Sequence, residues 1–440
     1  MKIYPFLFAL YINDIEEFFE NRNISSLHMI DEMNDNLLGM FIKLFILLYA
    51  DDTVIFSETR EEMQNMLDVF TDYCKQWKLY VNIDKTKVVV FSKRRYEANH
   101  KFKVIGEEIQ FSDNYCYLGV LFNYNGNITN AKKRLIVQSQ KALYSVYYKI
   151  RNIKIPIDLQ LKIFDALVAP ILLYGSEVLG FEKNDNIEKV HLQFLKKNLG
   201  VRITTPNFLV YGELGRYPLI VNIKCRMLCF WSKLVSSEKL SSKIYNLTYN
   251  LYKNGTNGLK WIDFIKKTFD EIGLSFIFTN QLEINPNWIK VHAKQILCDQ
   301  FVQRWRGDIA NSSRGHFYSI FKQEFCMEPY LTRLTEVHRK FITKLRVNNI
   351  KFPIETGRWR NINREDRICQ KCSLSLIGDE FHYLFVCNCH DILELRNKYI
   401  PNYFTTNASL EKMSRMLSLC NVELLQKISI FIKCISGLFQ

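Results

Sequence analysis

Two adjacent aspartates, Asp51 and Asp52, stand between two short apolar runs in the segment LLYADDTVIF at residues 47–56. Both runs contain aromatic or β-branched residues, which predicts two strands joined as a β-hairpin with the carboxylates at its tip. Neighbouring like charges repel each other, so such a pair is stable when it is solvated or when a cation neutralises it. The segment therefore predicts either a solvated turn, where aspartate is common, or a metal-binding tip.

The chain carries an excess of basic residues over its 440 positions. Its 59 Lys and Arg outnumber its 45 Asp and Glu, which gives a formal charge of +14. Such an excess favours a polyanionic partner, most simply nucleic acid, although it says nothing about the fold.

Neither a membrane span nor a disulfide framework is predicted. The apolar stretch at residues 41–50 is too short to cross a bilayer and contains Lys43. The N-terminal run MKIYPFLFALYI is similar to a signal peptide but lacks a small-residue cleavage site. Most of the 12 cysteines are scattered through a chain that is too long for a small secreted scaffold. We expect an intracellular protein without a membrane partner.

The first part of the chain predicts an α+β fold, with an antiparallel sheet covered by helices on one face. A capping box formed by Thr59 and Glu62 precedes an apolar stripe at helical spacing over residues 63–77. Strand-like segments follow at residues 81–93, 101–111 and 115–127.

From about residue 128 the pattern becomes helical, and the chain divides into five predicted parts: 1–126, 127–183, 184–365, 366–400 and 401–440. Residues 129–150 form a basic helix that also carries tyrosines, which is typical of a surface that lies along a phosphate backbone. A solvated helical face explains the same pattern. The candidate phosphate-binding cations are Lys132, Lys133, Arg134, Lys141, Lys149 and Arg151, and, further on, Arg358, Arg360, Arg364 and Arg367.

A possible zinc site lies in the segment RICQKCSLSLIGDEFHYLFVC. Cys369 and Cys372 have C-x2-C spacing, and His382 and Cys387 follow. Zinc prefers four thiolate or imidazole ligands in a tetrahedron, and a C-x2-C turn supplies two thiolates at the required separation. The alternatives are four unrelated buried residues, or a site that uses Cys389 or His390 in place of Cys387. Bound zinc would stabilise a segment too small to fold alone.

Several motifs resemble, in chain order, the reverse transcriptases of non-LTR (LINE-like) retrotransposons. LLYADDTVIFSET resembles the Y-x-D-D hairpin, and FLFALYINDI resembles the helix after the Gly-Gln-Gly substrate-pocket motif. VNIDKTKVVVF resembles the Asn…Lys-Thr motif, and YLGVLF resembles the primer-grip hairpin. ILLYGSEVLGF, TPNFLVYGELGRYPL and IETGRWRN resemble the thumb and C-terminal segments, so the resemblance covers nearly the whole chain.

The resemblance implies a partial polymerase palm, followed by a mostly helical thumb and connection region and a small zinc-binding module. It implies two-Mg²⁺ phosphoryl transfer on an RNA template and a DNA primer. The residues that match the family's functional positions are the metal ligands Asp51 and Asp52, the cation Lys87, the primer-contacting Tyr49, and the primer-grip residues Tyr117, Leu118 and Gly119.

One departure from the family pattern bears on activity. Successive strand residues point to opposite sides, so Asp51 and Asp52 cannot easily bind both metals. The family uses a further aspartate from a strand before the Gly-Gln-Gly motif, and Asp14 and Asp31 lie in the wrong places to supply it. We therefore expect a truncated reading frame or incomplete gene model without the fingers, the N-terminal half of the polymerase and any upstream endonuclease.

Two functions follow from these expectations. The chain is either a fragment of an RNA-directed DNA polymerase that is inactive alone, or a non-catalytic nucleic-acid-binding remnant with a structural zinc site.

Overall fold

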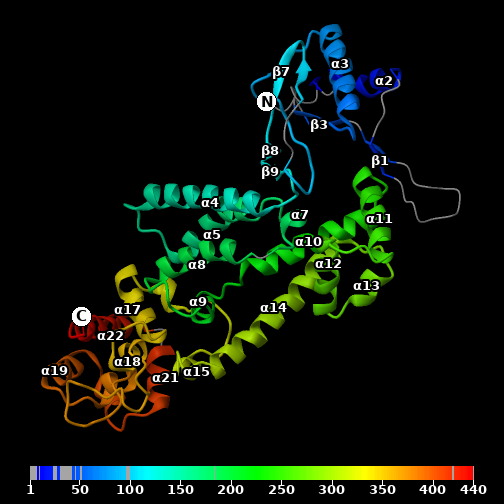
Figure 1. Ribbon diagram of the computed structural model, residues 1–440. Coiled ribbons are helices and arrows are strands. Elements are labelled where there is room, and N and C mark those ends of the chain that lie inside the picture. The colour runs from blue at the N-terminus through cyan, green and yellow to red at the C-terminus, as the bar shows by residue number, and fades with distance from the viewer. Residues whose placement is uncertain are drawn as a thin grey trace. The chain divides into compact units, whose positions relative to one another are not determined.

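The computed structural model describes residues 7–8, 10–22, 27–29, 42–44, 46–49, 52–95, 100–182, 184–418 and 421–439 (Figure 1). Contacts between Cα atoms divide the chain into two compact units. Unit 1 comprises Met1–Arg134, Trp231–Lys267 and Ile277–Ile284, and unit 2 comprises Leu135–Phe230, Thr268–Phe276 and Asn285–Gln440. No helix of the described residues is both long and apolar enough to cross a membrane.

The helices take up most of the chain after residue 128. They are α2 (Ile15–Glu20), α3 (Arg60–Gln76), α4 (Thr129–Ile150), α5 (Ile157–Leu167), α6 (Ala169–Leu172), α7 (Ser176–Leu179), α8 (Asp185–Leu199), α9 (Asn207–Leu214), α10 (Leu219–Val235), α11 (Leu240–Lys253), α12 (Lys260–Glu271), α13 (Ser275–Thr279), α14 (Pro286–Asn311), α15 (Tyr318–Phe321), α16 (Tyr330–Arg333), α17 (Glu336–Arg346), α18 (Pro353–Trp359), the π-helix η1 (His382–Val386), α19 (His390–Tyr399), α20 (Asn402–Thr405), α21 (Leu410–Ser418) and α22 (Val422–Gly437).

The strands are short and lie in unit 1. They are β1 (Leu27–Met29), β2 (Ile42–Leu44), β3 (Ile46–Tyr49), β4 (Asp52–Ile55), β5 (Lys87–Val88), β6 (Phe102–Val104), β7 (Glu107–Phe111), β8 (Asn114–Tyr117) and β9 (Val120–Asn123). Among the described residues they form four small sheets, and β5 pairs with β7 in parallel. The mixed α and β content agrees with the prediction, but a single antiparallel sheet is not formed.

The segment at residues 101–111, predicted as one strand, folds back on itself as the β6–β7 hairpin. The segment at residues 115–127 forms the β8–β9 hairpin, as the resemblance of YLGVLF to the primer-grip hairpin implies. In the first, Ile105 and Gly106 connect the strands with φ values of +53° and +82°. Positive φ at both central residues gives the type I′ turn whose twist matches the flanking strands.

Helix α3 begins at the predicted capping box and organises the apolar core of the α+β region. The Glu62 N–H donates to Thr59 Oγ1 at 3.2 Å, and the Thr59 N–H donates to Glu62 Oε2 at 3.1 Å. The buried residues of α3 pack against two other elements. Met66 and Tyr73 belong to one cluster with Phe19 of α2, and Leu67 belongs to another with Val104 of β6. The stripe is therefore core, because its burial removes apolar surface from water.

Unit 2 contains a buried cluster of charges between α9, α16 and α17. The Arg346 side chain is fully buried, and its Nε lies 3.1 Å from both carboxylate oxygens of Glu213. Its Nη2 lies 2.8 Å from Glu328 Oε2. The Tyr330 hydroxyl donates to Glu213 Oε2 at 2.5 Å, and Lys322 Nζ donates to Glu328 Oε1 at 2.5 Å. Two cations thus neutralise two carboxylates in the core, as buried charges require.

Candidate functional sites

The two-aspartate segment forms the predicted hairpin. Strand β3 pairs antiparallel with β4, and the last pair joins Tyr49 to Asp52. Asp52 is exposed and forms no ion pair with any other described residue. Ala50, Asp51 and the Tyr49 side chain lie outside what the structure describes, so the predicted roles of Asp51 and Tyr49 stay predictions. The register nevertheless places Asp52 at the first position of β4, opposite the last residue of β3, as the apolar runs on either side indicated.

The β8–β9 hairpin, which carries the predicted primer-grip residues, lies within electrostatic range of Asp52. The pKa of the Tyr117 phenol, at the end of β8, is raised first by burial and then by the negative charge of Asp52. The turn that follows has φ values of +46° at Leu118 and +80° at Gly119. Glycine adopts this conformation readily, whereas a leucine there is strained, and strain of this kind concentrates at functional positions. Three residues with a predicted primer-grip role thus lie at a tight turn near Asp52.

The Asn…Lys-Thr segment forms a turn followed by strand β5. Asn82 Oδ1 accepts the Lys85 N–H at 3.1 Å, and the Thr86 hydroxyl donates to the Asn82 carbonyl at 2.9 Å. The asparagine therefore closes the turn, as such side chains commonly do. Lys87 donates from Nζ to Gln110 Oε1 at 2.9 Å across the β5–β7 pair. The lysine of the Lys-Thr pair itself is Lys85, which lies in the turn and is a second candidate for the cation.

The basic helix α4 presents exposed tyrosines beside its cations. In the part of α4 that belongs to unit 2, Tyr144 and Tyr148 are 57% and 66% exposed, and Lys141 and Lys149 are exposed as well. The Arg151 guanidinium lies 4.3 Å from the centre of the Tyr148 ring. Lys141, Tyr144 and Tyr148 recur at intervals of three or four residues and therefore share one face of the helix. Lys149 lies about 100° around the helix from Tyr148, and Arg151 lies just beyond the end of α4. Lys132, by contrast, is only 8% exposed, so this predicted surface cation is buried.

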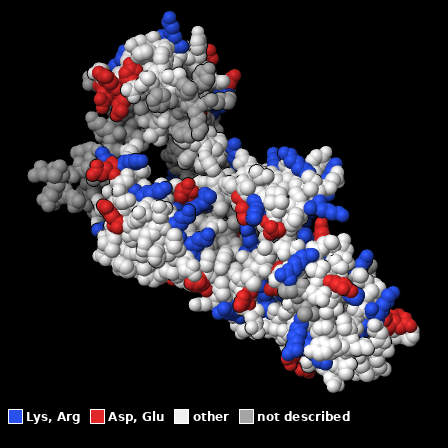
Figure 2. Space-filling model, turned by 180° about the vertical axis from the view of Figure 1, so that it is seen from behind, with Lys and Arg blue, Asp and Glu red and all other residues white. Residues whose placement is uncertain are grey.

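Figure 2 shows that Lys and Arg are scattered over the visible face of the molecule with Asp and Glu among them. On that face the excess of basic residues does not gather into one large patch. Any nucleic-acid surface must therefore be identified from local groups of residues, since a uniform positive charge gives only non-specific attraction.

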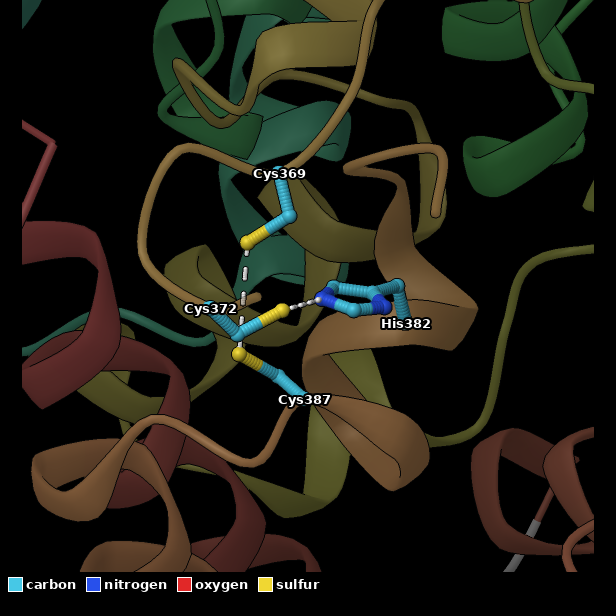
Figure 3. A group of neighbouring side chains, drawn as sticks. All are labelled: Cys369, Cys372, His382 and Cys387. Carbon is cyan, nitrogen blue, oxygen red and sulfur yellow. Dashed lines mark hydrogen bonds between the residues drawn. The ribbon is translucent and has the colours of Figure 1, made fainter. Parts of the chain in front are cut away.

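The four predicted zinc ligands lie together in unit 2. Figure 3 shows their side chains pointing toward one another, and their ligand atoms all lie within 4.8 Å of each other. Cys369 Sγ lies 4.0 Å from Cys387 Sγ, and Cys372 Sγ lies 3.4 Å from His382 Nε2. Tetrahedral zinc with Zn–S of about 2.3 Å and Zn–N of about 2.0 Å requires separations of about 3.8 Å and 3.5 Å. The donor set and its spacing fit this ion.

A π-turn brings the histidine and the third cysteine side by side. The Cys387 N–H donates to the His382 carbonyl at 2.8 Å, which closes the i→i+5 turn of η1. Five residues per hydrogen-bonded turn place the first and last residue next to each other, and π-turns are frequent at functional sites. Cys369 is held by a second local feature, an antiparallel bridge between Ile368 and Ile377.

Hydrogen bonds to sulfur favour thiolates at this site. The Lys371 N–H donates to Cys369 Sγ at 3.4 Å, and the Tyr383 hydroxyl donates to the same sulfur at 3.2 Å. Burial alone would raise the pKa of the Cys369 thiol, but these hydrogen bonds outweigh it and lower the pKa below its ordinary value. Burial raises the pKa of Cys387 to about 12, and the neighbouring thiols add to this effect. A bound cation would allow the thiols to ionise together.

The histidine is suited to the role of a neutral ligand. Burial lowers the pKa of His382 to about 4, and the positive charge of Arg396 contributes further. Its Nε2 faces Cys372, whereas its Nδ1 has no hydrogen-bond partner among the described residues. Asp379, three residues before His382, accepts the backbone N–H of His382 at 2.9 Å and not the ring.

The alternative ligands do not join the described cluster. Cys389 lies outside the group of four, and His390 is exposed beside Asp391 and Glu394. Tyr383 is the residue of this site that the sequence did not reveal. It donates to Cys369 and packs 4.4 Å from Phe352 and 4.9 Å from Phe439, measured between ring centres. Only its position directly after His382 could have indicated a role at the metal site, and that position is equally typical of a core residue.

Residues 1–122 match a protein family described as reverse transcriptase (RNA-dependent DNA polymerase). The matched range contains the β3–β4 and β8–β9 hairpins and the turn before β5. It does not extend to α4 or to the thiol cluster.

Three curated proteins align with about a third of the chain. The RNA-directed DNA polymerase from mobile element jockey of Drosophila melanogaster is 25% identical over 157 residues, which are 33% of this chain and 17% of that protein. Its counterpart from Drosophila funebris is 24% identical over 160 residues, 34% of this chain and 17% of that protein. A transposon-derived protein of Caenorhabditis elegans is 25% identical over 168 residues, 36% of this chain and 57% of that protein. The alignments therefore cover less than two thirds of each relative.

Proposed function

We propose that this chain forms part of an RNA-directed DNA polymerase of the kind found in non-LTR retrotransposons. The observation that carries the proposal is the match of residues 1–122 to the reverse transcriptase family, a range that includes the β3–β4 hairpin with Asp52 and the turn at Leu118 and Gly119. RNA template and DNA primer are the proposed partners.

Within this proposal, Asp51 and Asp52 hold Mg²⁺ through their carboxylate oxygens, which are the donors that this ion prefers. An exposed carboxylate at Asp52 that is not paired with a described cation fits this role. When bound, the ions would activate the primer hydroxyl and stabilise the leaving pyrophosphate. Tyr49 and the turn at Leu118 and Gly119 would position the primer end, and Lys85 or Lys87 would attract the triphosphate.

We expect the 440-residue polypeptide alone not to extend a primer. Two-metal catalysis needs ligands that contact both ions, and consecutive residues of a strand point to opposite sides, so the sequence predicts that Asp51 and Asp52 alone do not hold both metals. Asp14 cannot help readily, because it accepts a hydrogen bond from the Tyr73 hydroxyl at 2.7 Å beside the α2–α3 core. The measurement is incorporation of deoxynucleotides on an RNA template in the presence of Mg²⁺. Incorporation that Asp51→Ala and Asp52→Ala abolish would contradict this expectation and establish the hairpin as catalytic.

A second candidate function is nucleic-acid binding without catalysis, and the exposed face of α4 favours it. Lys141, Tyr144 and Tyr148 combine charge with aromatic rings on one helix face, and Lys149 and Arg151 add charge next to Tyr148. Lysines and arginines supply contacts to phosphates, whose neutralisation releases counterions. Exposed aromatic rings supply stacking surface.

The double variant Lys141→Gln and Lys149→Gln is expected to weaken binding of an RNA–DNA hybrid and to lower the salt dependence. Loss of two phosphate contacts should reduce the slope of log K against log salt by about 2. Fluorescence anisotropy with a labelled hybrid over a range of salt concentrations measures both effects. The double variant Arg415→Gln and Lys427→Gln, at exposed positions on α21 and α22, is the matched control. An unchanged slope in the double variant would show that α4 presents an ordinary solvated face.

The Cys369, Cys372, His382 and Cys387 cluster would hold one structural Zn²⁺. Three thiolates and one imidazole fill a tetrahedral shell, so no position is left for a reactive water. The main function of the ion would be to fix the chain between α18 and α19.

A further inference from the structure

Three arginines from separate segments meet on unit 2, apart from both α4 and the thiol cluster. They are Arg202, before α9, Arg314, after α14, and Arg358, in α18, and we call them the arginine cluster. Arg314 Nη1 donates to the Thr204 carbonyl at 2.9 Å, two residues from Arg202. Arg358 Nη2 donates to the Ser313 carbonyl at 3.1 Å, directly before Arg314. Residues far apart in sequence are thus fixed close together.

The arginine cluster concentrates positive charge. Glu355 is its one ion-paired carboxylate among the described residues, and it is shared by Arg202 and Arg358. Each of these two arginines also lies within electrostatic range of Arg314, which no described carboxylate neutralises by an ion pair. Glu380 adds a carboxylate within range of Arg358, but it is buried. The cations outnumber the accessible acids, which is the arrangement that attracts a phosphate group.

An exposed tryptophan covers part of the arginine cluster. The Arg202 guanidinium lies 4.7 Å from the centre of the Trp359 ring. Although Arg202 occupies one side of this ring, 51% of the Trp359 surface remains exposed. Large aromatic side chains usually bury more of their area, so the exposed ring is unusual unless a partner covers it. A flat ring that rests on a cation offers a stacking surface for a nucleobase.

Two further arginines extend the charge from Trp359 toward the thiol cluster. Arg360 follows the tryptophan directly, and Arg364 lies within electrostatic range of His316 and Asp379. Both arginines are exposed, and no hydrogen bond ties either side chain to the described part of the chain. Arg367, by contrast, donates from Nε and Nη2 to the Ile362 carbonyl and from Nη1 to the Ile354 carbonyl. It therefore holds the loop rather than a ligand.

We propose that the arginine cluster, Trp359, Arg360 and Arg364 bind a single strand of nucleic acid, with a phosphate against the guanidinium groups and an unpaired base on the tryptophan ring. The inference rests on the proposed function, because it assumes that the chain handles nucleic acid, and it adds a second contact surface to that of α4. A duplex would satisfy the arginines but not Trp359, since its bases are already stacked. The site therefore prefers an unpaired strand.

The test uses the full chain and three probes: a single-stranded RNA, a single-stranded DNA of the same sequence, and heparin, a polyanion without bases. Trp359→Leu keeps an apolar cover on Arg202 but removes the ring, so it should weaken binding of the single strands roughly tenfold while leaving heparin binding unchanged. The double variant Arg360→Gln and Arg364→Gln should weaken all three and lower the salt slope by about 2. Relative affinity for the RNA and the DNA identifies which strand is preferred.

A matched control separates the effect of losing charge at the arginine cluster from the effect of losing the same charge elsewhere on the surface. The double variant Arg415→Gln and Lys427→Gln removes the same charge from exposed positions on α21 and α22 and should change none of the affinities. Equal weakening of heparin and single strands by Trp359→Leu would overturn the base contact, as would unchanged binding in every cluster variant. If the wild-type chain binds the single strands and only the α4 variants weaken that binding, this inference alone fails. If the wild-type chain binds neither single strands nor hybrid, the proposed function fails with it.

Discussion

Replacement of Glu213 by alanine is expected to lower the free energy of unfolding of unit 2 by about 3–5 kcal/mol. Glu213 is 0% exposed and faces the equally enclosed guanidinium of Arg346 at 3.0–3.1 Å. Its removal would leave Arg346 with only the Glu328 carboxylate, which is already shared with Lys322. Tyr330 would lose its carboxylate acceptor and keep only Thr343 Oγ1, at 2.8 Å. An excess buried charge is costly in an apolar interior. Urea unfolding followed by circular dichroism measures the change.

Two further variants separate the charge effect from a general loss of packing. Glu411→Ala removes one partner of an exposed pair with Arg415 on α21, and it should leave the urea midpoint unchanged. The double variant Glu213→Leu and Arg346→Met removes both buried partners, so it should be less destabilised than the sum of the two single changes. A Glu213→Ala protein as stable as the wild type would contradict the account of this cluster.

Removal of zinc is expected to unfold the segment between α18 and α19 in the full chain. Apparent binding free energies of structural zinc are about 10–16 kcal/mol, and that energy is also folding energy for the residues it ties together. Without the ion, the three cysteine thiolates would repel one another. The contacts of Tyr383 with Phe352 and Phe439 would then loosen, because Tyr383 is hydrogen-bonded to one of these sulfurs. Elemental analysis should give one zinc per chain. Chelation or Cys372→Ser should remove it, lower the melting temperature and open this segment to proteolysis.

The choice of ligands has its own controls. Cys389→Ser tests the competing ligand set and should keep the zinc, because Cys389 lies outside the group of four. Cys326→Ser changes a cysteine outside that group and should alter neither metal content nor stability. A metal-free wild-type chain with unchanged melting and proteolysis would show that the four residues are ordinary core.

Features confined to one short stretch of chain could be predicted from the sequence. The capping box of Thr59 and Glu62 needs only two side chains three residues apart, and the structure forms it as predicted. The hairpin around Asp51 and Asp52 follows from two apolar runs and the break between them, and its strands pair as expected. The C-x2-C spacing indicated a metal site, and the four predicted ligand side chains converge. Each of these features depends on hydrogen bonds between residues close in sequence or on the spacing of residue types along the chain.

Features that depend on distant residues could not be predicted. Lys132 has the sequence context of a surface cation but is buried, because burial depends on what packs against the helix. The π-turn that joins His382 to Cys387 has no recognised sequence signal, and neither does the hydrogen bond from Tyr383 to Cys369. Among the residues that the structure describes, the strands pair in four small sheets, one of which contains a parallel pair, rather than in the one antiparallel sheet that was expected.

The sequence by itself determined the kind of chemistry available: paired carboxylates on a hairpin, thiols with an imidazole, and basic helices beside tyrosines. Tertiary structure decided which of these groups meet. Glu213 and Arg346 are 133 residues apart, and Arg202 and Glu355 are 153 apart, yet each pair is in contact. The physical reason is that a side chain's type sets the charge and hydrogen bonds it can offer, whereas its partner is set by how the whole chain packs. Two charges attract usefully only when the fold brings them within a few ångströms and excludes water.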